Sequence, residues 1–239
     1  MRVAIFSDVH GNLEALQAVL QQCDAMLVER TVCLGDLVGY GPDPTRCIEA
    51  IRDAAQLVLI GNHDHAIVSP SEARNFNPVA KAAIGWTSEH LEEVHVEYLR
   101  DLPLVIEEDD TIYVHSSPKG PELWPYLFSP EEGRRALAYT DARICFVGHS
   151  HHAFVCSDEK AEILGEGTIS TTGSARYLTN VGSVGQPRDG DPRAAFALWD
   201  QATEDIQLLR VAYDVELTQQ KIRKALLPEY LAERLAMGR

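Results

Sequence analysis

Residues 2–22 read RVAIFSDVHGNLEALQAVLQQ, and within this stretch a strand pattern gives way to a helix pattern. RVAIFSD is a short apolar run that ends in an acid, which is typical of a buried strand. NLEALQAVLQQ then repeats apolar residues at helical spacing, and Asn12 can cap its first turn. The stretch therefore predicts a strand followed by a helix that packs back onto it.

The same alternation continues along the first third of the chain. RTVCLGD and LVLIGNHD are two more strand-like runs, and PTRCIEAIRDA lies between them. That segment begins with Pro44 after Asp43, so we expect a helix with Asp43 as its N-cap. Strands that alternate with helices predict a parallel sheet with crossover helices.

The second half of the chain has a different order of predicted elements. Residues 76–101 predict one or two helices, and LVIEEDDTIYVHS predicts a hairpin that turns at Asp109-Asp110. Short strands are then expected in ARICFVGHS, AFVCSD, AEILGEGTI, RYLTNVGSV, AAFALWD and IQLLRVAYD. We therefore expect an α/β fold, a four-layer α/β/β/α sandwich of two mixed sheets.

The chain end predicts a helical tail. Residues 215–239 have a helical pattern broken at Pro228, and Leu231 and Leu235 could face either the body of the protein or a partner subunit. We expect 1–239 to form a single domain, with an oligomer possible through these C-terminal helices.

Composition and charge exclude several classes of protein. The 239 residues are 45% hydrophobic, which is enough for a substantial core and rules out a disordered or fibrous chain. A net charge of −15 argues against strong nucleic-acid binding, which depends on clustered Lys and Arg. No apolar run is long enough to cross a membrane, and the first residues do not form a secretory signal. We expect a cytoplasmic protein whose five cysteines are reduced and structural.

Asp, Asn and His gather where the predicted strands end. If the backbone there is extended, residues two apart such as Asp8 and His10 project to the same side. Each residue alone is more often a turn former, a helix cap or a solvated side chain. Together they suit a hard or borderline cation. The candidates are Asp8, His10, Asp36, Asn62, His63, Asp64, His115, His149 and His151.

These residues fall into a known series of motifs. DxH (Asp8, His10), GD (ending at Asp36), GNHD (61–64), a strand-terminal His115 and GHSH (148–151) resemble the calcineurin-like metallophosphoesterase superfamily. YGPDP (40–44) and NVGSVGQPRDGD (180–191) resemble its compact bacterial and archaeal phosphodiesterase branch. The resemblance implies the metallophosphoesterase fold.

The resemblance also implies roles for individual residues. One divalent metal ion would be held by Asp8, His10, Asp36 and His151, and a second by Asp36, Asn62, His115 and His149. His63 would face the substrate, where it donates to the phosphate or protonates the leaving oxygen, and Asp64 would orient His63. The metals could be manganese, Fe, Ni, Co or Zn, because all tolerate mixed oxygen and nitrogen ligands.

The implied activity is hydrolysis of a small phosphate ester, most simply a phosphodiester, by a hydroxide that the two metals activate. A phosphatase acting on phosphoprotein or dinucleoside polyphosphate uses the same metals and stays open as an alternative. So does a non-catalytic metal-binding scaffold of the same fold. Arg188 either binds a phosphate oxygen or pairs with Asp189 or Asp191, and Tyr40 either lines the pocket or only shapes a glycine-rich turn.

Overall fold

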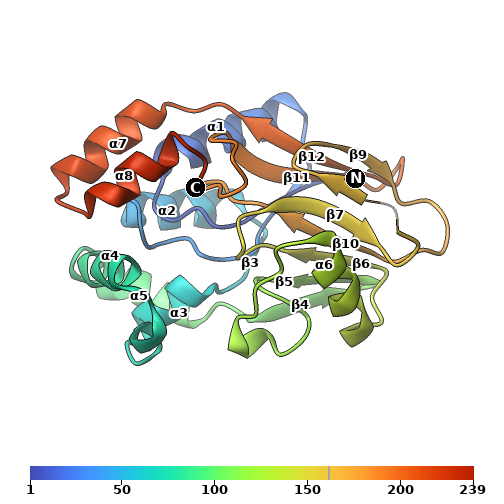
Figure 1. Cartoon of the computed structure of the whole chain (residues 1–239), viewed down its shortest axis with the longest axis horizontal. Coiled ribbons are helices and arrows are strands. Elements are labelled where there is room, and N and C mark those ends of the chain that lie inside the picture. Colours follow the sequence, from blue (N-terminus) through green and yellow to red (C-terminus); the bar gives the residue numbers. More distant parts are fainter. Residues whose placement is uncertain (161) are drawn as a thin grey trace.

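Two six-stranded mixed sheets lie face to face in the computed structural model, which describes residues 1–160 and 162–239 (Figure 1). The first sheet has the order β3 (Leu57–Val58), β2 (Arg30–Cys33), β1 (Arg2–Phe6), β11 (Ala194–Asp200), β12 (Asp205–Val211) and β9 (Gly167–Ser170). The second has the order β4 (Val105–Glu108), β5 (Thr111–Val114), β6 (Ile144–Val147), β10 (Tyr177–Val181), β7 (Ala153–Ser157) and β8 (Glu162–Leu164). Each sheet contains parallel and antiparallel pairs: β1 runs parallel to β2 and antiparallel to β11.

Helices cover the outer faces of the sheets. The α-helices of the described residues are α1 (Leu13–Ala25), α2 (Pro44–Ala54), α3 (Asn62–Val68), α4 (Pro78–Glu89), α5 (Glu93–Arg100), α6 (Pro130–Ala136), α7 (Val215–Lys224) and α8 (Glu229–Leu235). Helix α1 contacts β11 and β12 of the first sheet, whereas α6 contacts β7 and β10 of the second. Figure 1 shows α7 and α8 beside α1 and α2, with α3, α4 and α5 grouped below them. The predicted α/β sandwich of two mixed sheets is confirmed.

The alternation of side chains along β1 explains why it lies at the centre of the first sheet. Val3 and Ile5 belong to the core between the two sheets, while Ala4 and Phe6 pack with Leu16 under the outer helices. A strand that is buried on both faces needs a continuous apolar run, and VAIF, after the exposed Arg2, supplies one.

Most predicted elements form, with differences at their ends. The Asn12 side chain caps α1 by accepting a hydrogen bond from the Ala15 N–H at 3.2 Å. Asp43 precedes α2 but makes no capping bond, because its carboxylate pairs with Lys221 at 2.7 Å. The predicted strand AEILGEGTI is divided into β8 and β9 by the turn at Gly165, and its first residue, Ala161, lies outside the described residues.

The tail packs on its own chain. Leu231 and Leu235 are buried, and they share a cluster with Tyr40, Ala80 and Ala83. Of the two orientations open from sequence, these leucines therefore take the one toward the body. Lys221 of α7 adds an ion pair with Glu14 of α1 at 2.5 Å.

Two further expectations concern the chain as a whole. All five cysteines are free and buried. Within residues 1–160 and 162–239, none of the helices combines the length and apolar character needed to cross a bilayer.

Candidate metal centre

The predicted Asp, Asn and His residues come together at one end of the two sheets. They arrive on the loops that follow β1, β2, β5 and β6 and on the first turn of α3. All are buried: Asp8, His10, Asp36, Asn62, His63, Asp64, His115, His149 and His151.

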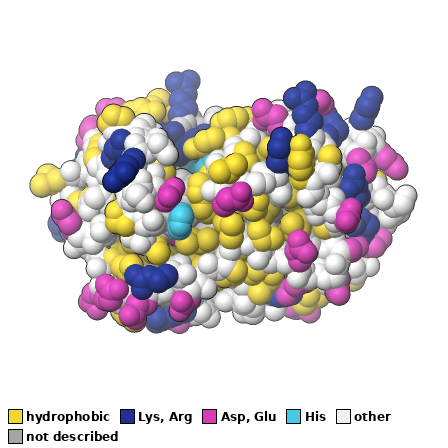
Figure 2. All heavy atoms as spheres, turned by 90° about the horizontal axis from the view of Figure 1, so that it is seen from below, with side chains coloured by type: hydrophobic (Ala, Val, Ile, Leu, Met, Phe, Trp, Pro, Cys, Tyr) yellow, Lys and Arg dark blue, Asp and Glu magenta, His cyan; other side chains and the backbone are white. Residues whose placement is uncertain are grey.

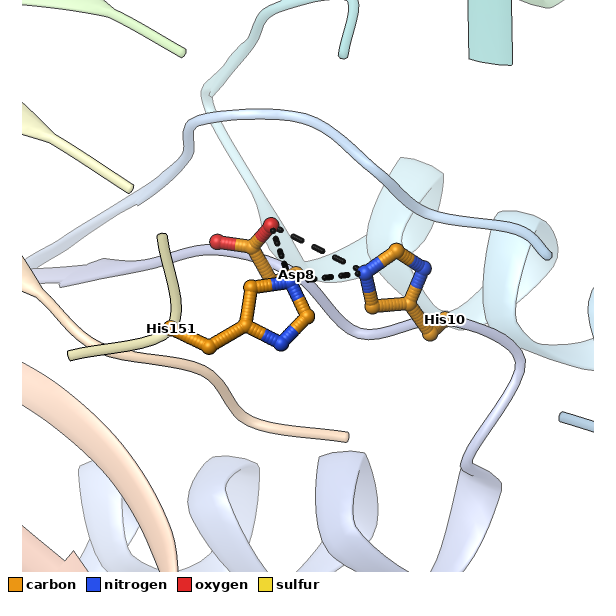
Figure 3. A group of neighbouring side chains, drawn as sticks. All are labelled: Asp8, His10 and His151. Carbon is orange, nitrogen blue, oxygen red and sulfur yellow. Dashed lines mark hydrogen bonds and ion pairs between the residues drawn. The ribbon is translucent and has the colours of Figure 1, made fainter. Parts of the chain in front are cut away.

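Asp8, His10 and His151 form one group that could hold a metal ion (Figure 3). Figure 3 shows the Asp8 carboxylate and the two imidazole rings turned toward a shared space. His151 Nε2 lies 3.2 Å from Asp8 Oδ1 and 3.1 Å from His10 Nε2. Asp8 and His10 lie near the start of the sequence and His151 lies beyond its midpoint, so only the folded chain brings these atoms together.

Asp36, His115 and His149 form a second possible metal-binding group. His115 Nε2 lies 3.4 Å from Asp36 Oδ2, and the His115 and His149 rings are 5.0 Å apart. Asp36 Oδ2 is also 3.6 Å from His10 Nε2, so this carboxylate reaches the first group as well. The arrangement suits a carboxylate shared between two neighbouring cations.

Main-chain carbonyls fix which nitrogen each histidine offers. Nδ1 of His10, His115 and His151 donates to the carbonyl oxygens of Val38, Leu34 and Gln186 at 3.0, 3.1 and 2.5 Å. A carbonyl only accepts, so Nδ1 carries a hydrogen, and Nε2 is the nitrogen that each ring in its neutral form offers to the centre. His149 is reversed: its Nε2 donates to the Trp124 carbonyl at 3.0 Å, which leaves Nδ1 free.

Each carboxylate uses one oxygen for the backbone and turns the other to the centre. Asp8 Oδ2 accepts from the His149 N–H at 2.9 Å, and Asp36 Oδ1 accepts from the His63 N–H at 2.8 Å. Asp8 Oδ1, Asn62 Oδ1 and His115 Nε2 are buried without a hydrogen-bond partner. Buried polar atoms are normally paired, so these atoms fit ligands of a cation.

The backbone at these residues is not extended, which corrects the sequence-based geometry. Strand β1 already ends at Phe6, and Asp8 and His10 have φ of 58° and 50°. Asp36, His149 and His151 also lie in the left-handed region. Non-glycine residues rarely adopt this conformation, and its concentration here is typical of a functional site.

Close packing explains the glycines of the GNHD and GHSH motifs. A Cβ on Gly61 would lie 2.1 Å from Asp36 Oδ1, and one on Gly148 would lie 2.6 Å from Asp8 Oδ2. A side chain at either position would displace a proposed ligand.

The electrostatics of the centre favour a bound cation. Burial opposes charge on the His115 ring, yet the nearby Asp36 carboxylate outweighs it and raises the pKa of His115 to about 9. Burial also favours the neutral form of Asp36, but the imidazoles around it hold the pKa of Asp36 well below its usual range. In contrast, burial lowers the pKa of His149 to about 3, so its ring is neutral near pH 7, as a metal ligand must be.

His63 and Asp64 lie at the edge of this centre. The His63 ring is 4.8 Å from the His10 ring and 4.5 Å from the Tyr40 ring, and its Nδ1 has no hydrogen-bond partner. His63 also forms a possible metal-binding group with His10 and Asp36.

The structure gives Asp64 partners different from the one expected. Its carboxylate accepts from the N–H groups of Leu37, Val38 and Gly61 at 2.9, 3.2 and 3.0 Å. Within the described residues, no hydrogen bond joins Asp64 to the His63 ring. Both oxygens accept from backbone donors, which ties Asp64 to the loop after β2.

Tyr40 and Arg188 lie beside the centre. The Tyr40 ring packs 4.6 Å from the His10 ring, and the Arg188 guanidinium lies over Tyr40 at 5.7 Å. Arg188 does not pair with Asp189 or Asp191, because those acids bind Arg210 and Arg193. It donates instead to Gln186 Oε1 at 2.8 Å.

Sequence reasoning missed several residues that support the centre. Asn180 Nδ2 donates to Ser150 Oγ at 2.8 Å, and Ser183 Oγ donates to the Asp8 carbonyl at 2.8 Å. Both lie in the glycine-rich stretch 180–191, which was the available signal. The Tyr126 ring also stacks on His149 at 4.0 Å.

Comparison with known proteins identifies the family to which this chain belongs. Residues 1–204 match the family model described as the calcineurin-like phosphoesterase superfamily domain. This chain belongs to that superfamily. It is 42% identical to the uncharacterized protein MJ0912 of Methanocaldococcus jannaschii, and the match covers 99% of this chain and 98% of that one.

Solved structures extend the similarity to three dimensions. The crystal structure of a metallophosphoesterase from Sphaerobacter thermophilus is similar with a TM-score of 0.90, at 39% identity over 100% of this chain and 99% of that one. A hypothetical protein, PH1004 from Pyrococcus horikoshii, shares the fold with a TM-score of 0.83 at 22% identity, covering 100% and 98%. The calcineurin-like phosphoesterase fold predicted from the motifs is thereby confirmed.

Proposed function

We propose that this protein is a metal-dependent phosphodiesterase with two divalent cations. One cation would be held by Asp8, His10, Asp36 and His151, and the other by Asp36, Asn62, His115 and His149. The observation that carries the proposal is the pair of buried, unpartnered ligand atoms Asp8 Oδ1 and His115 Nε2, which lie 3.9 Å apart.

The chemistry needs both the cations and the protein around them. When bound, a pair of divalent cations neutralises phosphate oxygens and supplies a nucleophile near neutral pH. The carbonyls behind His10, His115 and His151 hold their rings in one tautomer. With only two carboxylates among the ligands, the loaded centre keeps enough positive charge to attract a phosphate in a protein of net charge −15.

His63 is proposed to contact the substrate. Burial is the main cause that lowers the pKa of His63 to about 4, so its ring is neutral at pH 7. A neutral ring donates a hydrogen bond to a phosphate or leaving oxygen, and this favours that role over proton transfer from a charged imidazolium.

The proposal extends to the rest of the chain. Residues 1–239 would act as one domain, with a small phosphate ester as the substrate and the cytoplasm as its place of action, where thiols stay reduced. Figure 2 shows Lys and Arg scattered among acidic and hydrophobic side chains on the face it presents, without a continuous basic stripe. That distribution supports a small substrate over a nucleic-acid polymer.

One experiment separates this function from its alternatives. Purified protein is assayed on bis(p-nitrophenyl) phosphate and on p-nitrophenyl phosphate, before and after chelation, with metal measured by elemental analysis. We expect about two metal equivalents per chain, faster hydrolysis of the diester, and loss of both activities on chelation. Faster monoester hydrolysis would favour a phosphatase, and metal without hydrolysis of either ester would favour a non-catalytic scaffold.

A further inference from the structure

A cavity of about 430 Å³ lies beside the candidate metal centre. Its lining includes Tyr40, Asn77, Tyr126, Arg188, Tyr230 and Arg234. Tyr40 joins the two sites, because its ring packs against both His10 and His63. The volume is in the range of pockets that bind small molecules.

Two guanidinium groups face this cavity, and no described Asp or Glu side chain pairs with either of them. Among the described ion pairs, none joins Arg188 or Arg234 to an Asp or Glu side chain. Arg188 is held by Gln186 Oε1, and Arg234 donates from Nε to the main-chain oxygen of Arg239. Burial and the neighbouring Arg188 charge lower the pKa of Arg234, as expected for two cations that lack an anion between them.

Aromatic rings hold both guanidinium groups in place. Arg188 lies over the Tyr40 ring at 5.7 Å, and Arg234 lies over the Tyr230 ring at 5.1 Å. Stacking on a ring leaves the N–H edges of a guanidinium available, and those edges match the oxygens of a phosphate.

The start of α4 adds to the positive character of the cavity. Asn77 is the N-cap of this helix, and its Oδ1 accepts from the Ala80 N–H at 2.9 Å, so its amide Nδ2 remains for another partner. A helix N-terminus carries partial positive charge and favours an anion. The helix end and the two arginines come from three separate segments of the chain.

We propose that this cavity is a second anion site, and that the preferred substrate is a phosphodiester carrying a second phosphate group. The inference rests on the proposed function for its first site and deepens it. One phosphate would bind at the metal centre, and the other would lie between Arg188 and Arg234.

The C-terminal tail contributes residues to the proposed anion site. Tyr230 and Arg234 belong to α8, which lies beyond residue 204, where the match to the family model ends. The tail is also tied to the Arg188 loop, because the Gly190 N–H donates to the Gly238 carbonyl at 3.0 Å. Helix α8 therefore takes part in the proposed site by adding the Arg234 cation to it.

The kinetic test compares three dinucleotides: thymidylyl-thymidine alone, with a terminal 5′-phosphate and with a terminal 3′-phosphate. We expect one phosphorylated form to have a kcat/KM at least about 10-fold above the parent, since a charge-assisted contact contributes about one power of ten or more. Arg234→Gln and Arg188→Gln should each reduce this ratio, mainly through KM. Lys224→Gln is the matched control, because it removes a positive charge from an exposed position of the same tail. A ratio near one in the unmodified enzyme, or a ratio that Lys224→Gln reduces equally, would overturn the inference.

A binding measurement keeps this inference separate from the proposed function. Thymidine 3′,5′-bisphosphate and thymidine 5′-monophosphate are titrated into the metal-loaded protein and followed by calorimetry. If the bisphosphate binds more tightly than the monophosphate, and Arg234→Gln abolishes this difference, the anion site is supported. This holds even if the protein hydrolyses no diester, a result that would refute only the proposed function. Hydrolysis of diesters with equal binding of both nucleotides refutes the second site and leaves the phosphodiesterase standing.

Discussion

His63 is the residue whose role can be separated most sharply from metal binding. Its ring lies close enough to His10 and Asp36 to be a ligand, yet we propose that it contacts the substrate. His63→Ala should therefore lower kcat by about 10²-fold or more while metal content stays near that of the unmodified protein. Kinetics on bis(p-nitrophenyl) phosphate together with elemental analysis measure both quantities.

Two other histidine variants serve as controls for that result. His151→Ala removes a proposed ligand and should reduce the bound metal as well as the rate. His90→Ala changes an exposed ring that stacks on Trp86 away from the centre, so kcat and metal content should both stay unchanged. If His63→Ala loses metal as His151→Ala does, His63 is a ligand and its substrate role is refuted.

At the scale of elements, two glycines predict opposite effects of the same substitution. A Cβ on Gly61, at the start of α3, would meet Asp36 Oδ1 at 2.1 Å, so Gly61→Ala should destabilise the protein by about 1–3 kcal/mol and weaken metal binding. Gly85 is exposed within α4, and nothing lies within 4 Å of an added Cβ. Gly85→Ala should stabilise by about 0.5–1 kcal/mol, since alanine favours a helix. Urea unfolding of both variants checks the signs, and a stabilising Gly61→Ala would contradict the close packing described.

Local signals account for what the sequence predicted well. The strand and helix in residues 2–22 follow from apolar spacing and the Asn12 cap, both of which involve only near neighbours. The left-handed backbone at Asp8 and His10 was not predictable, because the surrounding fold imposes it against local preference. The same holds for Asp64, whose backbone partners at Leu37 and Val38 come from a loop that sequence order does not place beside it.

At the scale of the whole molecule, contacts between residues far apart in the sequence were the hardest feature to predict. The resemblance to the family motifs predicted that Asp8 and His151 bind the same metal ion. Arg234 belongs to no motif, and it reaches Arg188 only because α7 and α8 fold back over α1 and α4. The cavity next to the metal centre was therefore beyond sequence reasoning.

Burial of the histidine cluster also affects the stability of the whole fold. Burial lowers the pKa of His63 to about 4 and of His149 to about 3, and it lowers those of His10 and His151 well below the usual value. In the unfolded chain these groups take up protons near pH 6.5, whereas the folded protein keeps them neutral. Below about pH 6.5 the unfolded state therefore binds more protons, and the free energy of unfolding falls as pH falls.

Two groups oppose this trend. The raised pKa of His115, about 9, means that its stabilising contribution is complete below pH 6.5 and is lost as pH rises through 9. Burial, reinforced by the neighbouring Asp36, raises the pKa of Asp64 to about 7, so Asp64 also favours the folded state as pH falls below 7. Because the four histidines outnumber these two groups, we expect a net decrease in the free energy of unfolding as the pH falls.

Chelator-treated protein should accordingly unfold at a lower urea concentration at pH 5.5 than at pH 7.5, with an unchanged dependence of unfolding free energy on urea. His149→Gln removes one of the four histidines that titrate only on unfolding, so the difference between the two midpoints should become smaller. His90→Gln, at the exposed position outside the cluster, should leave that difference as it is. A midpoint that stays constant or rises on acidification would mean that the cluster is not held neutral by burial, and the case for a preformed set of metal ligands would lose its electrostatic support.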